Sequence, residues 1–315
     1  MKFNSFKKSL KLKLQALKCL LTYRYKDVQL PMVVKEKEDV LTIVNKDSEG
    51  DFYQIPKIIW IYWHEGLMPQ FMQKNIERIK DLNADHIVHI LDKESVMQYI
   101  PDLHITGDMQ LAHRADYIRL ELLSRFGGVW IDPSIIFYED LSWVQDAQNK
   151  KTFDLVGYFR ELATIDKAFP VIETWFLATP KGSTFINSWL EIFKPVTRLG
   201  SLGYYNYLIK NYNVSDFNER FVNVEYFIFN FAEQIASRNT PARNLYLKRS
   251  EDSAFFIQDS FFSNYKTNYA ITQIDAEEYS LPLIKLSSGD RMFVDTFYNW
   301  GMINKKSVIG RLLYN

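Results

Sequence analysis

The stretch that decides the fold is "RADYIRLELLSRFGGVWIDPSI", Arg114 to Ile135, which predicts a helix, a tight turn and a strand in immediate succession. We expect the helix to run from about Met109 to Phe126, with Asp108 as its N-cap. The pair Gly127 and Gly128 then ends the helix, reverses the chain and lets the backbone approach a ligand without interference from a Cβ atom. The strand after the turn ends in an aspartate, a proline and a serine.

Three charged side chains of this stretch are expected to meet at one site. Asp116 and Arg119 are three residues apart, so they share a face of the helix near its end. Asp132 lies at the carboxyl end of the strand, where open α/β sheets bind their ligands. On their own, Asp116 and Arg119 are more simply an ion pair on a surface helix. Together with the glycines and Asp132 they favour a site for a polyhydroxylated, phosphate-bearing ligand, because carboxylates accept hydrogen bonds from hydroxyls and arginine neutralises phosphate.

The segments around this stretch alternate between strand and helix patterns. "IPKIIWIYW" (55–63) and "DHIVHILD" (85–92) have the composition of strands, and a helical stripe that begins at Pro69 separates them. Further strands are expected at "VWIDPSIIFY", "DLVGYF" and "ETWFLAT", with pairing broken at Pro133 near the edge of the sheet. This order predicts an α/β fold with a mixed, mostly parallel sheet. Beyond about Leu199 the pattern loosens into aromatic segments.

The composition bounds the class of protein. The chain has 315 residues, 47% of them hydrophobic, which is enough for one large domain or two modest ones. Eight of its 38 basic residues precede the first acid, Asp27, so the rest of the chain has 30 basic against 38 acidic residues. This net charge of −8 argues against general nucleic-acid binding. Cys19 is the only cysteine, which excludes an intrachain disulfide and fits a reducing compartment.

Residues 1–50 are expected to form a basic amphipathic helix followed by a charged connector. Apolar side chains recur among lysines at helical spacing, at Phe3, Phe6, Leu10, Leu14, Leu17 and Leu21. Such a helix could lie on the anionic inner face of the cell membrane. It could equally dock on its own domain, with its lysines merely solvated. No apolar run reaches the roughly 18 residues of a membrane span, and the lysines that interrupt the segment are unlike a secretory signal.

Four blocks of the sequence carry a resemblance to a known family. They are "IPKIIWIYWHEG" (55–66), the stretch Arg114 to Ile135, "ETWFLATPKGSTFINSW" (173–189) and "LPLIKLSS" (281–288). In this order they resemble the bacterial capsular polysaccharide synthesis proteins. These are similar to a wider group of glycosyltransferases with the Rossmann-like GT-A fold, which includes yeast mannosyltransferases and the glucosylating domains of clostridial toxins. The resemblance implies a GT-A domain at 51–315, with a donor-nucleotide part at 51–199 and an acceptor or closing part at 200–315.

The resemblance implies roles for residues of the central block. Asp116 and Arg119 would hold hydroxyls of the donor sugar, and Asp132 would contact ribose or sugar as the first carboxylate of the family's Asp-x-Asp motif. The second carboxylate, which in the family ligates Mn²⁺ or Mg²⁺, is Ser134 here. A hydroxyl is a poor ligand for a hard cation, so a metal ion at Asp132 and Ser134 would be held weakly.

More distant residues would complete the metal and nucleotide sites. Asp259 and Asp290 are candidates for additional metal ligands. Trp63, at the end of the first strand, matches the family aromatic that stacks on uracil. Trp60 is the alternative, and we expect one of the two tryptophans to be a core residue instead.

Two further blocks are implied to frame the reaction. Lys285, with Ser287 and Ser288, matches a C-terminal element that closes over the diphosphate in relatives, where a lysine could stabilise the leaving group. An ordinary surface lysine would explain Lys285 equally well. Glu173 or Trp175 would line the acceptor side, although a core strand explains their apolar neighbours.

We therefore expect a cytoplasmic glycosyltransferase, peripheral at the inner face of the membrane. It would move a hexose, galactose or glucose, from a UDP-sugar to a lipid-linked capsular repeat unit, and the resemblance implies retention of configuration. One alternative is a catalytically silent binding or scaffold subunit of the capsule assembly complex, in which Ser134 marks a decayed site. A second alternative is a metal-independent sugar-phosphate transferase.

Overall fold

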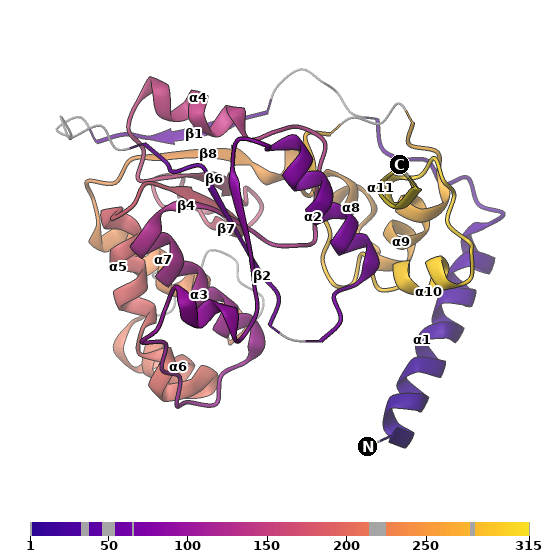
Figure 1. The fold of residues 1–315 in the computed structure, drawn as a ribbon, viewed down its shortest axis with the longest axis horizontal. Coiled ribbons are helices and arrows are strands. Elements are labelled where there is room, and N and C mark those ends of the chain that lie inside the picture. Colours follow the sequence, from indigo (N-terminus) through magenta and orange to yellow (C-terminus); the bar gives the residue numbers. More distant parts are fainter. Residues whose placement is uncertain are drawn as a thin grey trace.

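A central seven-stranded sheet organises the molecule. The computed structural model describes residues 2–32, 38–45, 54–64, 66–213, 225–277 and 281–314. In Figure 1, helices α3, α5, α6 and α7 gather on one side of the sheet, and the C-terminal helices lie on the other side together with α2. The strands of the large sheet are β1 (Val40–Ile43), β2 (Ile58–Tyr62), β3 (Ile87–Leu91), β4 (Gly128–Ile131), β6 (Leu155–Phe159), β7 (Ile172–Thr179) and β8 (Leu245–Arg249).

The sheet is mixed and mostly parallel, as the sequence predicts. Its strand order is β1-β8-β6-β7-β4-β2-β3. Strand β2 pairs in parallel with β3 and β4, and β6 pairs in parallel with β8. Only β7, between β4 and β6, and β1, at the edge beside β8, are antiparallel to their neighbours among these described strands. Five of the seven strands therefore run in one direction.

Helices cover both faces of the sheet, so side chains alternate between two buried layers. On β2, Trp60 and Tyr62 pack into the core formed with α3, α5 and α7, whereas Ile59 and Ile61 pack against α2 and α4 on the opposite face. The helices concerned are α2 (Gln70–Leu82), α3 (Leu111–Phe126), α4 (Ser142–Lys150), α5 (Thr184–Phe193), α6 (Val196–Asn211) and α7 (Ile228–Asn239).

The start of α3 differs from the prediction. The helix begins at Leu111, with Gln110 in the N-cap position and no capping hydrogen bond from a side chain of its own segment. Asp108 instead accepts a backbone hydrogen bond from Ser201 N at 2.9 Å, and the Ser201 hydroxyl accepts the N–H of Gln110 at 2.9 Å. The contact with α6 thus replaces the predicted local cap, which sequence spacing could not reveal.

The predicted strand "VWIDPSIIFY" is broken at Pro133, as expected, but not at the edge of the sheet. Its first half, β4, lies between β7 and β2 in the centre. Asp132 still donates its N–H to Trp175 O at 2.9 Å. Beyond Pro133 the chain leaves the sheet and forms β5 (Ile135–Phe137), which pairs antiparallel with β9 (Leu283–Lys285) in a separate two-stranded sheet.

Two other segments depart from the prediction. Residues 40–43, placed by the sequence in a charged connector, form the edge strand β1 because Leu41 and Ile43 pack on the core. Residues 93–100, whose sequence favours a short helix closed by Pro101, form a single 3₁₀ turn, η1 (Ser95–Gln98). A second 3₁₀ turn, η3 (Ser250–Asp252), follows β8.

The amino-terminal helix α1 (Lys2–Tyr23) belongs to a third core built with C-terminal elements. Its Ala16 and Cys19 are fully buried, and the Cys19 thiol donates to Tyr265 O at 3.2 Å. Figure 1 shows α1 leaning away from the sheet beside α10. None of the helices in the described ranges has the length and hydrophobicity that crossing a bilayer requires. The remaining helices are α8 (Phe256–Phe261), α9 (Asn264–Gln273), α10 (Val294–Asn299) and α11 (Val308–Tyr314).

Candidate functional site

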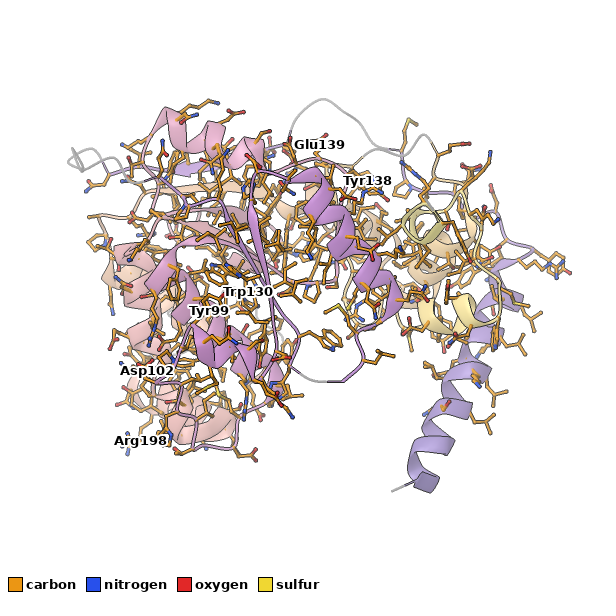
Figure 2. All side chains as sticks on the ribbon, viewed as in Figure 1. Tyr99, Asp102, Trp130, Tyr138, Glu139 and Arg198 are labelled. Atoms are coloured by element: carbon orange, nitrogen blue, oxygen red, sulfur yellow. The ribbon has the colours of Figure 1, made fainter. Side chains whose placement is uncertain are left out.

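The junction of α3 and β4 brings the three predicted charged side chains together. Arg119 donates from Nη1 to Asp116 Oδ1 at 2.6 Å and from Nη2 to Asp132 Oδ1 at 3.2 Å. The same Asp132 oxygen accepts a hydrogen bond from Trp130 Nε1 at 3.0 Å, and the guanidinium lies 4.8 Å from the Trp130 ring. Trp130 itself lies in the middle of the sheet (Figure 2). Strand β4 therefore positions both the Asp132 carboxylate and the Trp130 ring on which Arg119 lies.

The small sheet delivers Lys285 to the other side of Asp132. Lys285 pairs with Ile135 across β5 and β9, and its N–H bonds to Ala254 O at 2.9 Å. Its ammonium donates to Asp132 Oδ2 at 2.9 Å and to Ser134 Oγ at 2.9 Å. Because the chain leaves the large sheet at Pro133, β5 can pair with β9. This pairing holds Lys285 against Asp132, although the two residues are 153 positions apart in the sequence.

Burial and neighbouring cations set the pKa values of Asp116 and Asp132. The Arg119 side chain is only 5% exposed, and Asp116 is 14% exposed. Desolvation raises the pKa of Asp116 to about 6, although Arg119 partly opposes the shift. Burial would also raise the pKa of Asp132, but Lys285 and Arg119 together hold it below its ordinary value. Asp132 is therefore the carboxylate that stays ionised at neutral pH.

These side chains line a cleft of about 680 Å³. That volume lies within the range of small-molecule sites. Most residues expected to contact donor or acceptor line it, namely Trp63, Asp116, Arg119, Asp132, Ser134, Glu173, Trp175, Lys285, Ser287 and Ser288. Aromatic residues from the poorly patterned part of the chain also line it: Tyr226, Phe227, Phe229 and Phe255.

The two candidate tryptophans, Trp60 and Trp63, lie in different environments. Trp63 lines the cleft, and its ring nitrogen is buried without a hydrogen-bond partner in the described part of the chain. Trp60 is 1% exposed, stacks on His89 and donates to Gly127 O at 2.8 Å. Trp60 is thus the core residue of the pair, and a stacking role for it against uracil does not fit its position.

Gly127 and Gly128 serve the turn and do not line the cleft. Both have positive φ, 68° and 95°. A Cβ on Gly127 would lie 2.5 Å from Lys181 N, and one on Gly128 would lie 2.6 Å from Ile58 O. The close approach expected toward a ligand is instead an approach to the protein's own backbone.

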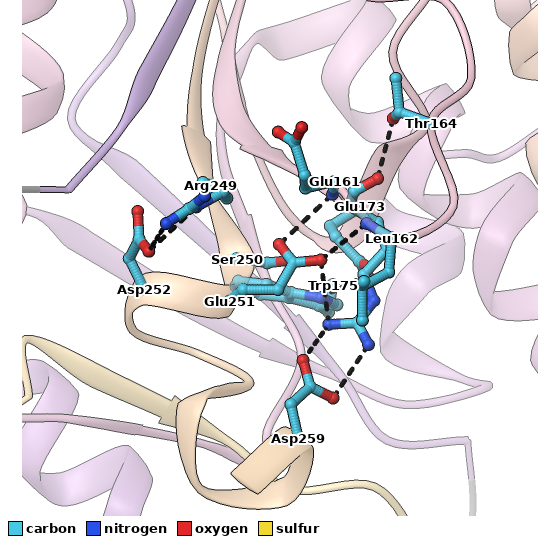
Figure 3. Close-up of polar contacts among 11 residues, drawn as sticks. Glu161, Leu162, Thr164, Glu173, Trp175, Arg249, Ser250, Glu251, Asp252 and Asp259 are labelled. Atoms are coloured by element: carbon cyan, nitrogen blue, oxygen red, sulfur yellow. Dashed lines mark hydrogen bonds and ion pairs between the residues drawn. The ribbon is translucent and has the colours of Figure 1, made fainter. Parts of the chain in front are cut away.

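The two distant metal-ligand candidates are engaged elsewhere. Asp259 accepts two hydrogen bonds from Arg160, at 2.5 and 2.9 Å (Figure 3). Asp290 is buried and accepts from Ser287, at 3.1 Å from the backbone N–H and also from the hydroxyl. Across the described residues, no group of three or more His, Cys, Asp or Glu side chains is placed to hold a metal ion.

The donor set at Asp132 and Ser134 does not fit Mn²⁺ or Mg²⁺. The two cations prefer several oxygen ligands, of which carboxylates are the strongest. Here one carboxylate and one hydroxyl are offered, and both already accept from the Lys285 ammonium. A dication between them would sit beside a fixed positive charge.

Glu173 and Trp175 lie on β7 and line the same cleft. Trp175 Nε1 donates to Glu173 Oε2 at 2.6 Å. Burial raises the pKa of Glu173 to about 7, with Arg160 and Trp175 opposing the shift. Glu173 is therefore a carboxyl group that can be present in either protonation state near neutral pH.

Two arginines of the cleft escaped the sequence prediction. Arg160 follows β6 directly, so the rule that located Asp132 at a strand end would also have located it. Its guanidinium is bound by Asp259 and, at 3.4 Å, by Glu251 (Figure 3). Arg291 reaches the cleft from the turn after Ser288, where no strand or helix pattern marks it.

Comparisons with known proteins find similarity to fungal glycosyltransferases. O-glycosyltransferase braB of Annulohypoxylon truncatum is 30% identical over 158 residues, which cover 44% of this chain and 37% of that protein. Glycosyltransferase afumC of Aspergillus fumigatus is 26% identical over 156 residues, which cover 43% and 39%. The chain thus spans less than two fifths of the length of these relatives.

A solved structure and a family model were also matched. The PaToxG glycosyltransferase structure gives a TM-score of 0.32 at 15% identity, over 58% of this chain and 77% of that one, a likeness too distant to support a conclusion. The model of the family described as capsular polysaccharide synthesis protein matches residues 20–292. This match spans most of the chain and confirms the resemblance carried by the four sequence blocks. The chain belongs to the capsular polysaccharide synthesis protein family.

Proposed function

We propose that this protein is a glycosyltransferase with a GT-A-type donor site. It moves a hexose, galactose or glucose, from a UDP-sugar to a lipid-linked capsular polysaccharide repeat unit, with retention of configuration. Membership of the family supports a place in capsule synthesis, and the names of the fungal relatives support transfer of a sugar. The division into a donor part at 51–199 and an acceptor part at 200–315 belongs to the same proposal.

One observation carries the proposal: four charged side chains form a single bonded set inside the cleft. Asp116, Arg119, Asp132 and Lys285 are linked through hydrogen bonds of 2.6 to 3.2 Å. A nucleotide sugar presents both hydroxyls and phosphates, so it needs acceptors and cations side by side. The set is also rigid, because α3, β4 and β9 position its members, and such preorganisation is what stabilises charge in a transition state.

In this proposal the nucleobase of the donor stacks on Trp63. This side chain borders the cleft and an adjoining pocket of about 710 Å³ that His64 and Asp92 also line. A flat ring at the shared wall of two cavities suits stacking by a nucleobase. The diphosphate would then point toward Lys285 and Ser287, and the sugar toward Asp116 and Arg119.

The proposed reaction breaks the bond between the anomeric carbon and the phosphate oxygen. The electron pair leaves with UDP, and the acceptor oxygen forms the new glycosidic bond from the same face. The acceptor proton passes to the leaving phosphate, so no strong base is required of the protein. Its residues orient the two substrates and stabilise the departing charge. Glu173 and Trp175 would hold the acceptor.

The proposed site of action is the cytoplasmic face of the membrane, where the lipid-linked acceptor lies. Helix α1 supports this placement. Its leucines Leu10, Leu14, Leu17 and Leu21 are 45–60% exposed, whereas its opposite face is docked on the protein. Exposed lysines flank the leucines: Lys13 precedes Leu17 by four residues, and Lys18 follows Leu14 by four. An apolar face bordered by cations suits an anionic bilayer.

Release of UDP from a sugar donor tests the proposed activity. The purified protein is incubated with UDP-glucose, UDP-galactose, UDP-N-acetylglucosamine or GDP-mannose without acceptor, and free nucleotide is measured. We expect slow release of UDP from one UDP-hexose and thermal stabilisation of the protein by the same compound. Release of nothing, together with no thermal shift by any of the four donors, would contradict the proposal and favour the silent scaffold subunit.

A further inference from the structure

Arg291 is a cation of the cleft that lies outside the charged set around Asp132. Arg291 lines the same cleft as Ser287 and Ser288. Its guanidinium makes no hydrogen bond and no ion pair with any residue in the described ranges, and its Nε is buried without a partner. A nearby aromatic ring, Phe71 of α2, lies 5.8 Å from it.

Asp295, Asp132 and Asp290 attract the guanidinium of Arg291, but none of them forms an ion pair with it in the described structure. Asp290 accepts hydrogen bonds from Ser287, and Asp295 forms no ion pair with Arg291 in the described structure. Burial accordingly lowers the pKa of Arg291, and the attraction of Asp295, Asp132 and Asp290 does not restore it. A desolvated guanidinium without a counter-ion is costly. Its position is explained if an anion enters the cleft and binds it.

Lys285 occupies the place where a family metal ion would be coordinated. Its ammonium lies 2.9 Å from both Asp132 Oδ2 and Ser134 Oγ, the two side chains of the altered Asp-x-Asp motif. The pairing of β9 with β5 holds it there. The ammonium group of Lys285 thus contacts both side chains of the motif, and Arg291 lines the same cleft.

We infer that Lys285 and Arg291 together bind the donor's diphosphate and replace the divalent cation at this site. The inference rests on the proposed function and specifies how its donor is held. Two fixed cations match the two charges that a divalent ion would neutralise, and a guanidinium can bind a phosphate through two hydrogen bonds. Ser288, which lines the same cleft, offers a hydroxyl donor, whereas the Ser287 hydroxyl is bound to Asp290.

Calorimetry with UDP and with uridine tests the inference without requiring turnover. In EDTA, we expect the wild-type protein to bind UDP at least tenfold more tightly than uridine, and Mn²⁺ to change the UDP affinity less than twofold. Arg291→Gln should weaken UDP binding at least tenfold and leave uridine binding unchanged. Arg78→Gln is the matched control. Arg78 also lies over an aromatic ring, Tyr138 at 4.9 Å, and its Nε has no partner among the described residues, but it lies outside the cleft.

Restoring the second carboxylate of the motif and removing the lysine tests directly whether Lys285 replaces the metal ion. The double variant Ser134→Asp with Lys285→Met restores two carboxylates and removes the ammonium, so its UDP affinity should rise at least tenfold on addition of Mn²⁺. UDP binding by the wild-type protein that requires Mn²⁺, or an Arg291→Gln variant that binds UDP normally, overturns the inference and leaves the proposed function standing. No UDP binding under any condition overturns both.

Discussion

At the scale of single residues, Asp132 is the member of the site with the most bonds. It accepts from Arg119, Trp130 and Lys285, and it stays ionised while Asp116 does not fully do so at neutral pH. Asp132→Asn keeps the shape of the side chain but removes the charge that orients both cations. We expect it to lower kcat/KM for donor hydrolysis by at least about 10²-fold, the scale of losing one preorganised electrostatic contact.

Asp102→Asn provides the comparison for Asp132→Asn. Asp102 also accepts from an arginine of α3, with Arg125 Nη2 at 2.8 Å, but its side chain is 67% exposed and does not line the cleft. Its loss should leave hydrolysis unchanged and shift the unfolding midpoint little, because exposed ion pairs contribute about 0–1 kcal/mol. Equal activity in the two variants would remove Asp132 from the donor site.

Only some residues of the site could be predicted from the sequence. Asp116, Arg119 and Asp132 could be predicted to meet because helix and strand periodicity fix their directions within one continuous stretch. Trp60 and Trp63 could not be told apart, because both follow the same apolar strand pattern. Arg291 could not be predicted from the sequence, because a turn has no periodicity and only tertiary packing brings this residue to the cleft.

At the scale of elements, the exposed leucines of α1 are expected to bind the membrane. Leu14→Gln with Leu17→Gln alters side chains that are 60% and 45% exposed, so the fold should keep its stability. The double variant should bind vesicles of phosphatidylglycerol and phosphatidylcholine at least about tenfold more weakly, because inserting each leucine contributes roughly 1.5–3 kcal/mol. Co-sedimentation with the vesicles measures the change.

Leu202→Gln, on α6, is the matched control for the leucine face, because Leu202 is 58% exposed and lies far from α1 in sequence and core. It should bind the vesicles like the wild-type protein. Membrane binding that survives the double substitution would contradict the role of α1, as would equal binding to vesicles of phosphatidylcholine alone.

The helical pattern of α1 was predictable, but the way it packs was not. Sequence spacing grouped the leucines into one stripe and left open whether that stripe docks on the protein or on a membrane. The structure uses a different face, with Ala16 and Cys19, to dock on the protein. Strand β1 was missed for a related reason: four residues between charged segments form a strand only because β8 offers an edge.

At the scale of the whole molecule, two buried acids make stability fall as pH rises. Burial raises the pKa of Glu173 to about 7 and that of Glu233 to about 8. Their folded-state pKa values lie above the unfolded value of about 4.3, so the folded state binds these protons more tightly. The stabilisation is complete below about pH 4.3 and is lost as pH rises through 7 and 8.

Glu233→Gln tests this pH dependence. Glu233 is fully buried, with Oε1 unpartnered in the described structure and Oε2 accepting from Gln234 at 2.8 Å. The wild-type protein should lose stability between pH 6 and pH 9, and the variant should recover part of it, on the order of 3 kcal/mol at pH 9. Denaturant unfolding at both pH values measures the difference. Glu191→Gln, at an exposed site on α5, should follow the wild-type protein, and an identical pH profile for Glu233→Gln would contradict the assignment.

The central claim is that the cleft at the end of β4 binds the sugar donor. The most direct measurement is a crystal structure of the protein with UDP and a hexose, or with the intact UDP-hexose. We expect the uracil against Trp63, the phosphates against Lys285 and Arg291, and the sugar hydroxyls within hydrogen-bond distance of Asp116 and Arg119. Electron density for the nucleotide at any other surface, with this cleft filled only by water, would contradict it.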